Sequence, residues 1–233
     1  MKFTLGRRAA LVVSLSVLAV QSGVAQAAPA PVTPAQRRAL LLDPSKPFWK
    51  TKAPATVTAD VETSRGVVTI ELIRDWAPAG VDHFYNLARA GYYDDSRFYR
   101  VMWGFIAQFG IAGDPAIAKT WLQRHIPADP ARELNVRGTI AYAQFKPADR
   151  ATNVFFNLHD NPSLDTLKFT PIGRVVQGME VLDSLYAFYG EVPAAEAPIG
   201  DPKRLYGESN KYLDAKFPKL DRILKITVRE TSP

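Results

Sequence analysis

Two polar side chains interrupt an otherwise apolar stretch of the sequence, and they are the first candidates for chemistry. The stretch runs from Phe98 to Gly110, and the two residues are Arg100 and Gln108. A guanidinium is always charged and can only donate hydrogen bonds, so burying it without partners is costly. Trp103-Gly104 predicts a tight turn between two strands. Arg100 is therefore either an edge-strand residue that points into water or part of a functional site, and this stretch alone favours neither.

The sequence holds few residues for metal or disulfide chemistry. It contains three histidines and no cysteine, so no disulfide is possible. His83 has no histidine or cysteine partner at the spacing of metal ligands, and we expect it to be a solvated residue of a helix. We therefore expect neither a metal ion nor a cofactor.

Two segments together resemble the cyclophilins, which are peptidyl-prolyl cis/trans isomerases. The family's first signature is Phe-His-Arg, two apolar residues, a variable residue, Gly-Phe, two further residues, Gln and then Gly, and residues 98–110 are similar to it. The second signature is a strand, a proline-containing loop and a Gln-Phe-Phe strand, which residues 141–158 resemble without a gap. The resemblance runs from about Ala55 to Val228. It implies an enzyme that isomerises X-Pro peptide bonds.

Hydrophobic patterning by itself predicts a mostly β domain. Alternation of apolar and polar residues indicates an antiparallel hairpin over 57–72, and helical periodicity indicates a helix from Asp75 to Ala90. Further strands are expected at 139–143, 154–158, 169–176 and 223–228, and a second helix at 179–186. The resemblance implies that the strands form a closed eight-stranded antiparallel barrel with two capping helices.

The reaction that the resemblance implies needs neither a nucleophile nor a metal. Rotation about an X-Pro bond faces a barrier of about 18–20 kcal/mol, because the amide C–N bond has partial double-bond character. A site that fits the twisted amide better than either planar form accelerates this rotation. In the twisted amide the prolyl nitrogen regains a lone pair, and the resemblance assigns Arg100 to donate to it.

The resemblance also implies roles for the residues around Arg100. Gln108 holds the guanidinium or the substrate carbonyl, and Phe105 completes the catalytic group. Ala143 and Gln144 present backbone groups to the peptide, which lies beside them like an added strand. The apolar pocket for the proline ring is formed by Phe105, Ile106, Phe155 and Leu164. For its two phenylalanines, ordinary barrel core is the alternative.

Three positions depart from the family's pattern. Asn153 stands where the family has a Gln and is shorter by one methylene. We expect that it loses a substrate contact, so that activity is reduced but measurable and Asn153→Gln raises kcat/KM. The alternative is that neighbours such as Thr152 and Gln144 have adapted to Asn, so that Gln would clash. Ser163 stands where many members have a Trp, which bears on binding of the cyclic-peptide inhibitor cyclosporin. Phe169 falls near the family's pocket-edge His, and we expect it and Asn153 to contact substrate.

The N-terminal residues predict export. Lys2, Arg7 and Arg8 precede an apolar run, and Ala25-Gln26-Ala27 is a small-x-small cleavage site, so residues 1–27 are predicted to be a signal peptide. Loss of these three basic residues lowers the net charge from +6 to +3. The remaining basic residues alternate with acidic ones, which argues against nucleic-acid binding. We expect a periplasmic monomer that is free of the membrane after cleavage.

Two further units follow the predicted signal peptide. Residues 28–54 are predicted to be a linker and a short helix that begins at Thr33-Pro34. Residues 55–230 are the predicted isomerase domain. Within it, the proline-containing stretch 111–137 is expected to be mainly loop, and 188–212 a long surface excursion.

Two classes of function remain open. The first is an isomerase that speeds folding of proline-containing, exported clients. The second is a binding or chaperone module on the same barrel, which holds proline-containing peptides with little turnover. Arg100, Phe105 and Gln108 favour the enzyme, and Asn153 favours the binding module. A third class, a β-barrel that is unrelated to the cyclophilins and carries a ligand, fits poorly. Arg100 and Gln108 would place two polar side chains in the apolar wall of such a barrel.

The mature protein is expected to begin at Ala28, because the small-residue motif Ala25-Gln26-Ala27 directly follows the apolar run. N-terminal sequencing of the protein from a periplasmic extract measures this. An intact Met1 in that extract would contradict the prediction.

Overall fold

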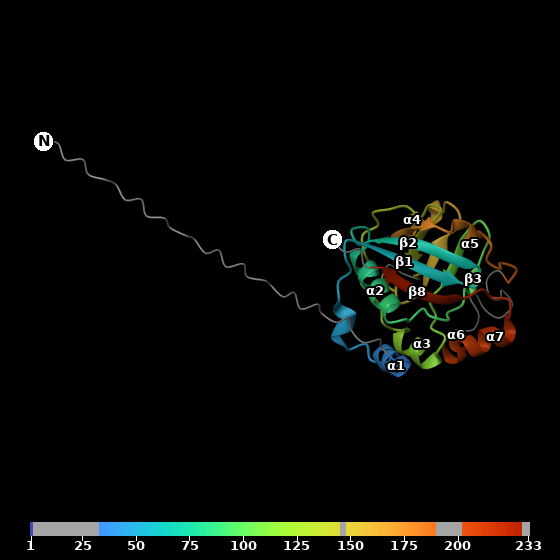
Figure 1. Cartoon of the computed structure of the whole chain (residues 1–233). Coiled ribbons are helices and arrows are strands. Elements are labelled where there is room, and N and C mark those ends of the chain that lie inside the picture. Colours follow the sequence, from blue (N-terminus) through green and yellow to red (C-terminus); the bar gives the residue numbers. More distant parts are fainter. Residues whose placement is uncertain (2–32, 145–147, 190–201, 230–233) are drawn as a thin grey trace. The chain divides into compact units, whose positions relative to one another are not determined.

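The computed structural model describes residues 1, 33–144, 148–189 and 202–229 (Figure 1). Apart from Met1, the predicted signal peptide and the linker up to residue 32 therefore lie outside the described residues. The described residues from 33 onward belong to one unit, Val32–Pro233. Among the described residues, no helix is both long and apolar enough to cross a membrane.

The described strands form one eight-stranded antiparallel sheet, shown in Figure 1. Its order is β3-β4-β6-β5-β7-β2-β1-β8. The strands are β1 (Thr56–Thr63), β2 (Gly66–Ile73), β3 (Arg100–Val101), β4 (Ile106–Phe109), β5 (Thr139–Tyr142), β6 (Val154–Asn157), β7 (Pro171–Gln177) and β8 (Ile223–Arg229). The mostly β class, the strand number and the antiparallel pairing are confirmed.

The predicted closure of the barrel is corrected by the strand order, in which β3 and β8 are the two ends. Only two residues long, β3 is too short to form a ladder along β8. A single bridge between Arg97 and Arg222 joins the segments beside these strands. The backbone N–H groups of Phe98 and Ile223 donate across it, each at 2.9 Å. The sheet is therefore curled, with an open strand order and one bridge between its ends.

Two helices correspond to the predicted capping helices. The first, α2 (Pro78–Arg89), packs against β7 and β8, and the second, α5 (Met179–Asp183), packs against β2. The prediction extended α5 three residues too far. The other described helices are α1 (Pro34–Leu41), the 3₁₀ turn η1 (Pro47–Lys50), α3 (Pro115–Trp121), α4 (Pro162–Thr166), α6 (Pro202–Glu208) and α7 (Asn210–Lys216).

Helices α3 and α6 lie in stretches that were predicted to be loop or surface excursion, and α7 begins at the end of the second stretch. The side chain of Asp114 accepts a hydrogen bond from the N–H of Ala116 at 2.8 Å, and Pro115 is the first helical residue of α3. Proline is favoured there because its missing N–H would have no helical partner. The prolines that favoured a loop therefore start helices, at Pro115 in α3 and at Pro202 in α6.

The N-terminal helix docks on α3. Thr33 and Gln36 form the predicted capping box at its start. At its end Leu41 is buried, and its carbonyl accepts a hydrogen bond from Nε1 of the buried Trp121 at 2.8 Å. Figure 1 shows α1, α3, α6 and α7 following one another along one side of the sheet.

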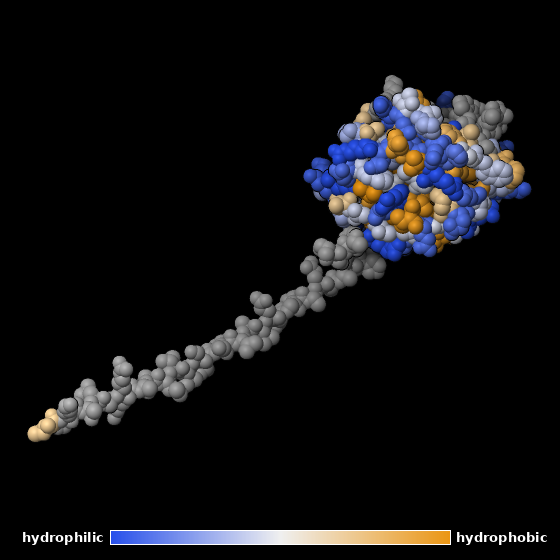
Figure 2. All heavy atoms as spheres, turned by 90° about the horizontal axis from the view of Figure 1, so that it is seen from above, coloured by the Kyte–Doolittle hydropathy of each residue, from blue (hydrophilic) through white to orange (hydrophobic). Residues whose placement is uncertain are grey.

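The hydrophobic core lies inside the curled sheet. The inward side chains of the first hairpin are fully buried: Val57, Ala59, Val61, Val68, Ile70 and Leu72. This is the alternation that the sequence predicts for a strand with one face in the core. On the face of the molecule seen in Figure 2, apolar residues gather in small groups between hydrophilic ones.

His83 on α2 is not the solvated residue that was predicted. Its ring centroid lies 5.8 Å from that of Trp121 and 6.2 Å from that of Tyr142. Burial lowers the pKa of His83 to about 4, a backbone hydrogen bond to Ala151 partly opposes this, and the charge of Arg150 lowers it further. The imidazole is therefore neutral in the folded protein at neutral pH.

This buried imidazole predicts a loss of stability in acid. An unfolded His has a pKa near 6.5, so the unfolded chain binds the proton first as the pH falls. The His83 contribution to the free energy of unfolding should therefore decrease between about pH 6.5 and 4, by about 3 kcal/mol at most. Denaturant unfolding at pH 7 and pH 4.5 measures it.

In that experiment the His83→Phe variant should lose less stability in acid than the wild type. The exposed His159 provides a control, and His159→Phe should behave like the wild type. Equal acid losses in His83→Phe and wild type would contradict the prediction.

Candidate active site

The register of four strands brings the predicted residues into one row. Arg100 on β3 lies opposite Gln108 on β4, Gln108 lies opposite Phe155 on β6, and Phe155 lies opposite Ala141 on β5. Side chains directly opposite one another share a face of the sheet, and so do residues two apart on one strand. Ile106 on β4 therefore joins this row.

The row carries a second apolar cluster, distinct from the main core. The neighbours of its residues along the strands, Ala107 and Phe156, belong to the main core. Side-chain alternation thus gives β4 and β6 one face in the core and one in the site. Phe155 lies on the site face and not in the barrel core. The cluster consists of Ile106, Ala141, Phe155 and Leu164, with Phe105, Ala143 and Phe169 packed against it.

A cavity of about 570 Å³ opens over this cluster. All ten residues that the sequence analysis assigned to the site line it: Arg100, Phe105, Ile106, Gln108, Ala143, Gln144, Asn153, Phe155, Leu164 and Phe169. Their assembly is a structural fact, and their separate roles stay predictions. Within the described ranges, no group of histidine and carboxylate side chains is suited to hold a metal ion.

Arg100 is flanked by an amide and an aromatic ring. Its Nη1 lies 3.4 Å from Oε1 of Gln108, and its guanidinium carbon lies 5.7 Å from the centroid of Phe105. Nε2 of Gln108 donates to the hydroxyl of Tyr99 at 2.6 Å. Burial raises the pKa of Tyr99, so this hydroxyl stays uncharged. Tyr99 thereby turns the acceptor end of the amide toward the guanidinium.

The opposite wall is built from β5, β6 and the loop after α4. The N–H of Ala143 donates to the carbonyl of Asn153 at 2.9 Å, so this donor is used between the two strand ends. Nε2 of Gln144 donates to a backbone carbonyl of the loop after α4 at 3.0 Å. The ring of Phe169 meets that of Phe155 edge-on, with centroids 5.7 Å apart. These contacts give the apolar cluster a fixed aromatic rim.

Asn153 has a partner that the sequence analysis did not foresee. Its Nδ2 donates to the hydroxyl of Tyr206 on α6 at 2.7 Å. This hydrogen bond supports the alternative in which the residues around position 153 have adapted to Asn, and it names Tyr206 as one such residue. Pro202, the first residue of α6, is a signal that could have revealed this helix, because proline is favoured at that position.

Other lining residues were also missed. Tyr99 lies inside the first signature, where the family has a His, so its place was visible in the sequence. Leu122 and His125 follow α3, which was predicted to be loop. Ser163 and His159 are exposed, and neither is among the residues that line the cavity.

Comparison with known proteins identifies the family. The family model described as "Cyclophilin type peptidyl-prolyl cis-trans isomerase/CLD" matches residues 58–203, which is more than half of the chain. The chain belongs to this family. Peptidyl-prolyl cis-trans isomerase A of Dickeya dadantii is 35% identical over 129 residues, which cover 53% of this chain and 67% of that protein.

Two further comparisons show how much of each relative this chain covers. Peptidyl-prolyl cis-trans isomerase-like 2 of Cryptococcus neoformans is 32% identical over 158 residues, which cover 65% of this chain. The chain spans about a quarter of that relative, 26% of its length. The crystal structure of a Cryptosporidium parvum cyclophilin type peptidyl-prolyl cis-trans isomerase matches with a TM-score of 0.55 and 18% identity, over 76% of this chain and 99% of that one. This last likeness shows the fold.

The position of Arg100 predicts that an Arg100→Ala variant loses most isomerase activity and keeps its fold. Loss of a charged hydrogen bond in the transition state costs about 1.5–3 kcal/mol, which is roughly tenfold to a hundredfold in kcat/KM. A protease-coupled assay on an Ala-Pro peptide measures the rate, and thermal unfolding checks the fold.

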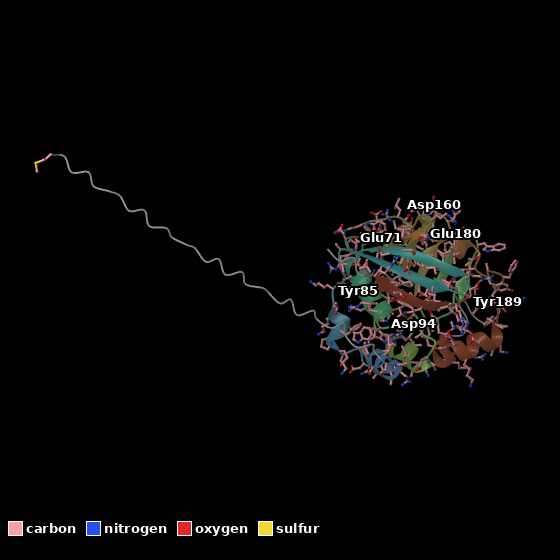
Figure 3. The ribbon with its side chains drawn as sticks, viewed as in Figure 1. Glu71, Tyr85, Asp94, Asp160, Glu180 and Tyr189 are labelled. Carbon is pink, nitrogen blue, oxygen red and sulfur yellow. The ribbon has the colours of Figure 1, made fainter. Side chains whose placement is uncertain are left out.

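The matched control is Arg174→Ala. Arg174 on β7 pairs with Glu71, which Figure 3 labels on β2, and lies outside the cavity lining. This variant should keep wild-type activity. Wild-type turnover in Arg100→Ala would show that the guanidinium has no part in catalysis.

Proposed function

We propose that the protein is a peptidyl-prolyl cis/trans isomerase that acts by non-covalent stabilisation of the twisted X-Pro amide. One observation carries the proposal. Arg100, with its amide partner Gln108, lies in the same cross-strand row as the apolar cluster around Phe155 and lines the same cavity. The apolar pocket suits the proline ring, and the permanently charged guanidinium beside it suits the prolyl nitrogen of the amide.

The apolar cluster would bind the proline ring. Ile106 and Phe155 are almost fully buried at the floor of the cavity, and Leu164 closes its side from α4. A bound ring would therefore be held by side chains that cannot easily move. The acyl part of the substrate would then rotate about the C–N bond while the ring stays in place.

Arg100 would act on the prolyl nitrogen. In a planar amide this nitrogen shares its lone pair with the carbonyl and is a poor acceptor. In the twisted amide the lone pair is localised, so a donor beside it binds the transition state better than either ground state. Gln108 orients the guanidinium, and the apolar surroundings strengthen the interaction.

The relatives support this substrate class. A Cryptosporidium parvum relative has been crystallised in the presence of the dipeptide Ala-Pro, and its structure matches with a TM-score of 0.54. The clients we propose for this chain are proline-containing polypeptides. The sequence of residues 1–27 supports export, so we place these clients in the periplasm and the protein among them as a monomer.

The wild-type protein is expected to accelerate cis-to-trans conversion of an Ala-Pro peptide in a protease-coupled assay, in proportion to its concentration. Uncatalysed exchange takes roughly tens to hundreds of seconds, so acceleration is readily measured. Peptide binding, followed by calorimetry, separates the two classes of function. Binding without acceleration would refute the isomerase and identify a binding module.

A further inference from the structure

Helix α6 carries a tyrosine that belongs to the cavity although it lies outside the family's segment. The family model ends at residue 203, and the next turn of α6 supplies Leu205 and Tyr206 to the cavity lining. Leu205 is 1% exposed, and α6 packs against α3, so the helix is part of the packed structure. The wall beyond Asn153 is therefore formed by α6, just after the stretch that the family model matches.

The hydrogen bond between Asn153 and Tyr206 leaves one donor over. Nδ2 of Asn153 donates and the hydroxyl oxygen of Tyr206 accepts, at 2.7 Å. With the amide in this orientation, the proton of the Tyr206 hydroxyl has no acceptor among the described residues, and Oδ1 of Asn153 is buried without a partner. Turning the amide over would pair these two groups and leave the N–H donors of Asn153 unused instead, so in either orientation the pair keeps a donor for a ligand. Burial raises the pKa of Tyr206, although the Asn153 contact lowers it in part, so the hydroxyl keeps its proton at neutral pH. An unpaired donor in a peptide-binding cavity fits a ligand carbonyl.

The position of Tyr206 is fixed by the connection to α7. Ser209, between the two helices, is buried and has a φ of 47°, a strained value for a residue with a side chain. The guanidinium of Arg204 lies 4.0 Å from the ring centroid of Tyr212. Asp214 on α7 pairs with the buried Arg97 at 2.8 Å, just before β3. These contacts hold α6 and α7 against the strand that carries the catalytic arginine.

We propose that Tyr206 is a substrate-positioning residue, whose hydroxyl donates to a main-chain carbonyl of the proline-containing peptide. It takes the place of the longer Gln amide that the family has at position 153. Asn153 orients the hydroxyl by donating to its oxygen, so the two residues together reach as far as one Gln. This inference rests on the proposed function, because it assigns a contact to the same substrate.

A purely structural hydroxyl, present to satisfy Asn153, leads to different expectations. Its removal would change stability and would leave peptide affinity unaltered. A substrate-binding hydroxyl instead changes affinity and leaves the fold as it is. Tyr206→Phe separates the two, because it removes one oxygen and keeps the ring that lines the cavity.

The first experiment measures KM, kcat and thermal unfolding of Tyr206→Phe with the Ala-Pro peptide. Loss of a neutral hydrogen bond should raise KM about threefold to tenfold, with kcat and the melting temperature nearly unchanged. The matched control is Tyr189→Phe. Tyr189, labelled in Figure 3, lies outside the cavity lining and should give wild-type values.

The second experiment replaces Asn153 by Gln in both backgrounds. In the wild type the extra methylene pushes the amide into the hydroxyl of Tyr206, so Asn153→Gln should lower kcat/KM. In Tyr206→Phe the vacated space admits the longer amide, which then donates to the peptide itself. The double variant should therefore have a lower KM than Tyr206→Phe alone.

Specific outcomes would overturn the inference. An unchanged KM in Tyr206→Phe would exclude a substrate contact, and a fall in melting temperature that accounts for the KM change would assign the residue to the fold. If the wild type binds the peptide without isomerising it, the proposed function fails separately. In that case the peptide affinities of Tyr206→Phe and the wild type are compared by calorimetry. Equal affinities would still refute the Tyr206 contact.

Discussion

The register between β4 and β6 decides which side chains enter the core and which face the cavity. A slip of β4 by one residue along β6 would move Gln108 into the core and turn Ala107 toward the cavity, while Phe155 and Phe156 kept their faces, because strand side chains alternate. Gly110 helps to fix this register. Its φ is 119°, and a Cβ there would clash with the carbonyl oxygen of Thr152. A glycine at the end of β4 is therefore a steric requirement for the site.

A charged donor beside an apolar wall must keep enough partners to stay buried and enough freedom to bind substrate. Arg100 is only partly buried, and its contact with Gln108 is long at 3.4 Å. Tyr99 fixes the amide more tightly than the amide fixes the guanidinium, because its hydrogen bond is 2.6 Å long. The more rigid hydrogen bond is thus the one between Gln108 and Tyr99, and Arg100 keeps the freedom that its proposed role beside a twisting amide would need.

The sequence predicted local patterns well and long-range contacts poorly. The ten residues predicted for the site line one cavity, because most of them lie in two contiguous signatures that strand register brings together. The barrel closure was overstated, since the two-residue length of β3 cannot be read from an apolar run. The solvated state of His83 was inferred from its place on α2 alone. The rings that cover it, Trp121 on α3 and Tyr142 on β5, come from distant parts of the chain.

The helices outside the strand sheet connect the N-terminal extension to the cavity. Leu122 and His125 line the cavity directly after α3, and α3 is held by α1. The exposed ion pair between Arg38 and Asp114 contributes little to this docking, since such pairs stabilise by about 0–1 kcal/mol. Burial of Trp121 contributes more, because a large aromatic surface leaves water. The outer cavity wall therefore depends on packing by residues that precede the family's segment, which makes residues 33–53 part of the domain that forms the site.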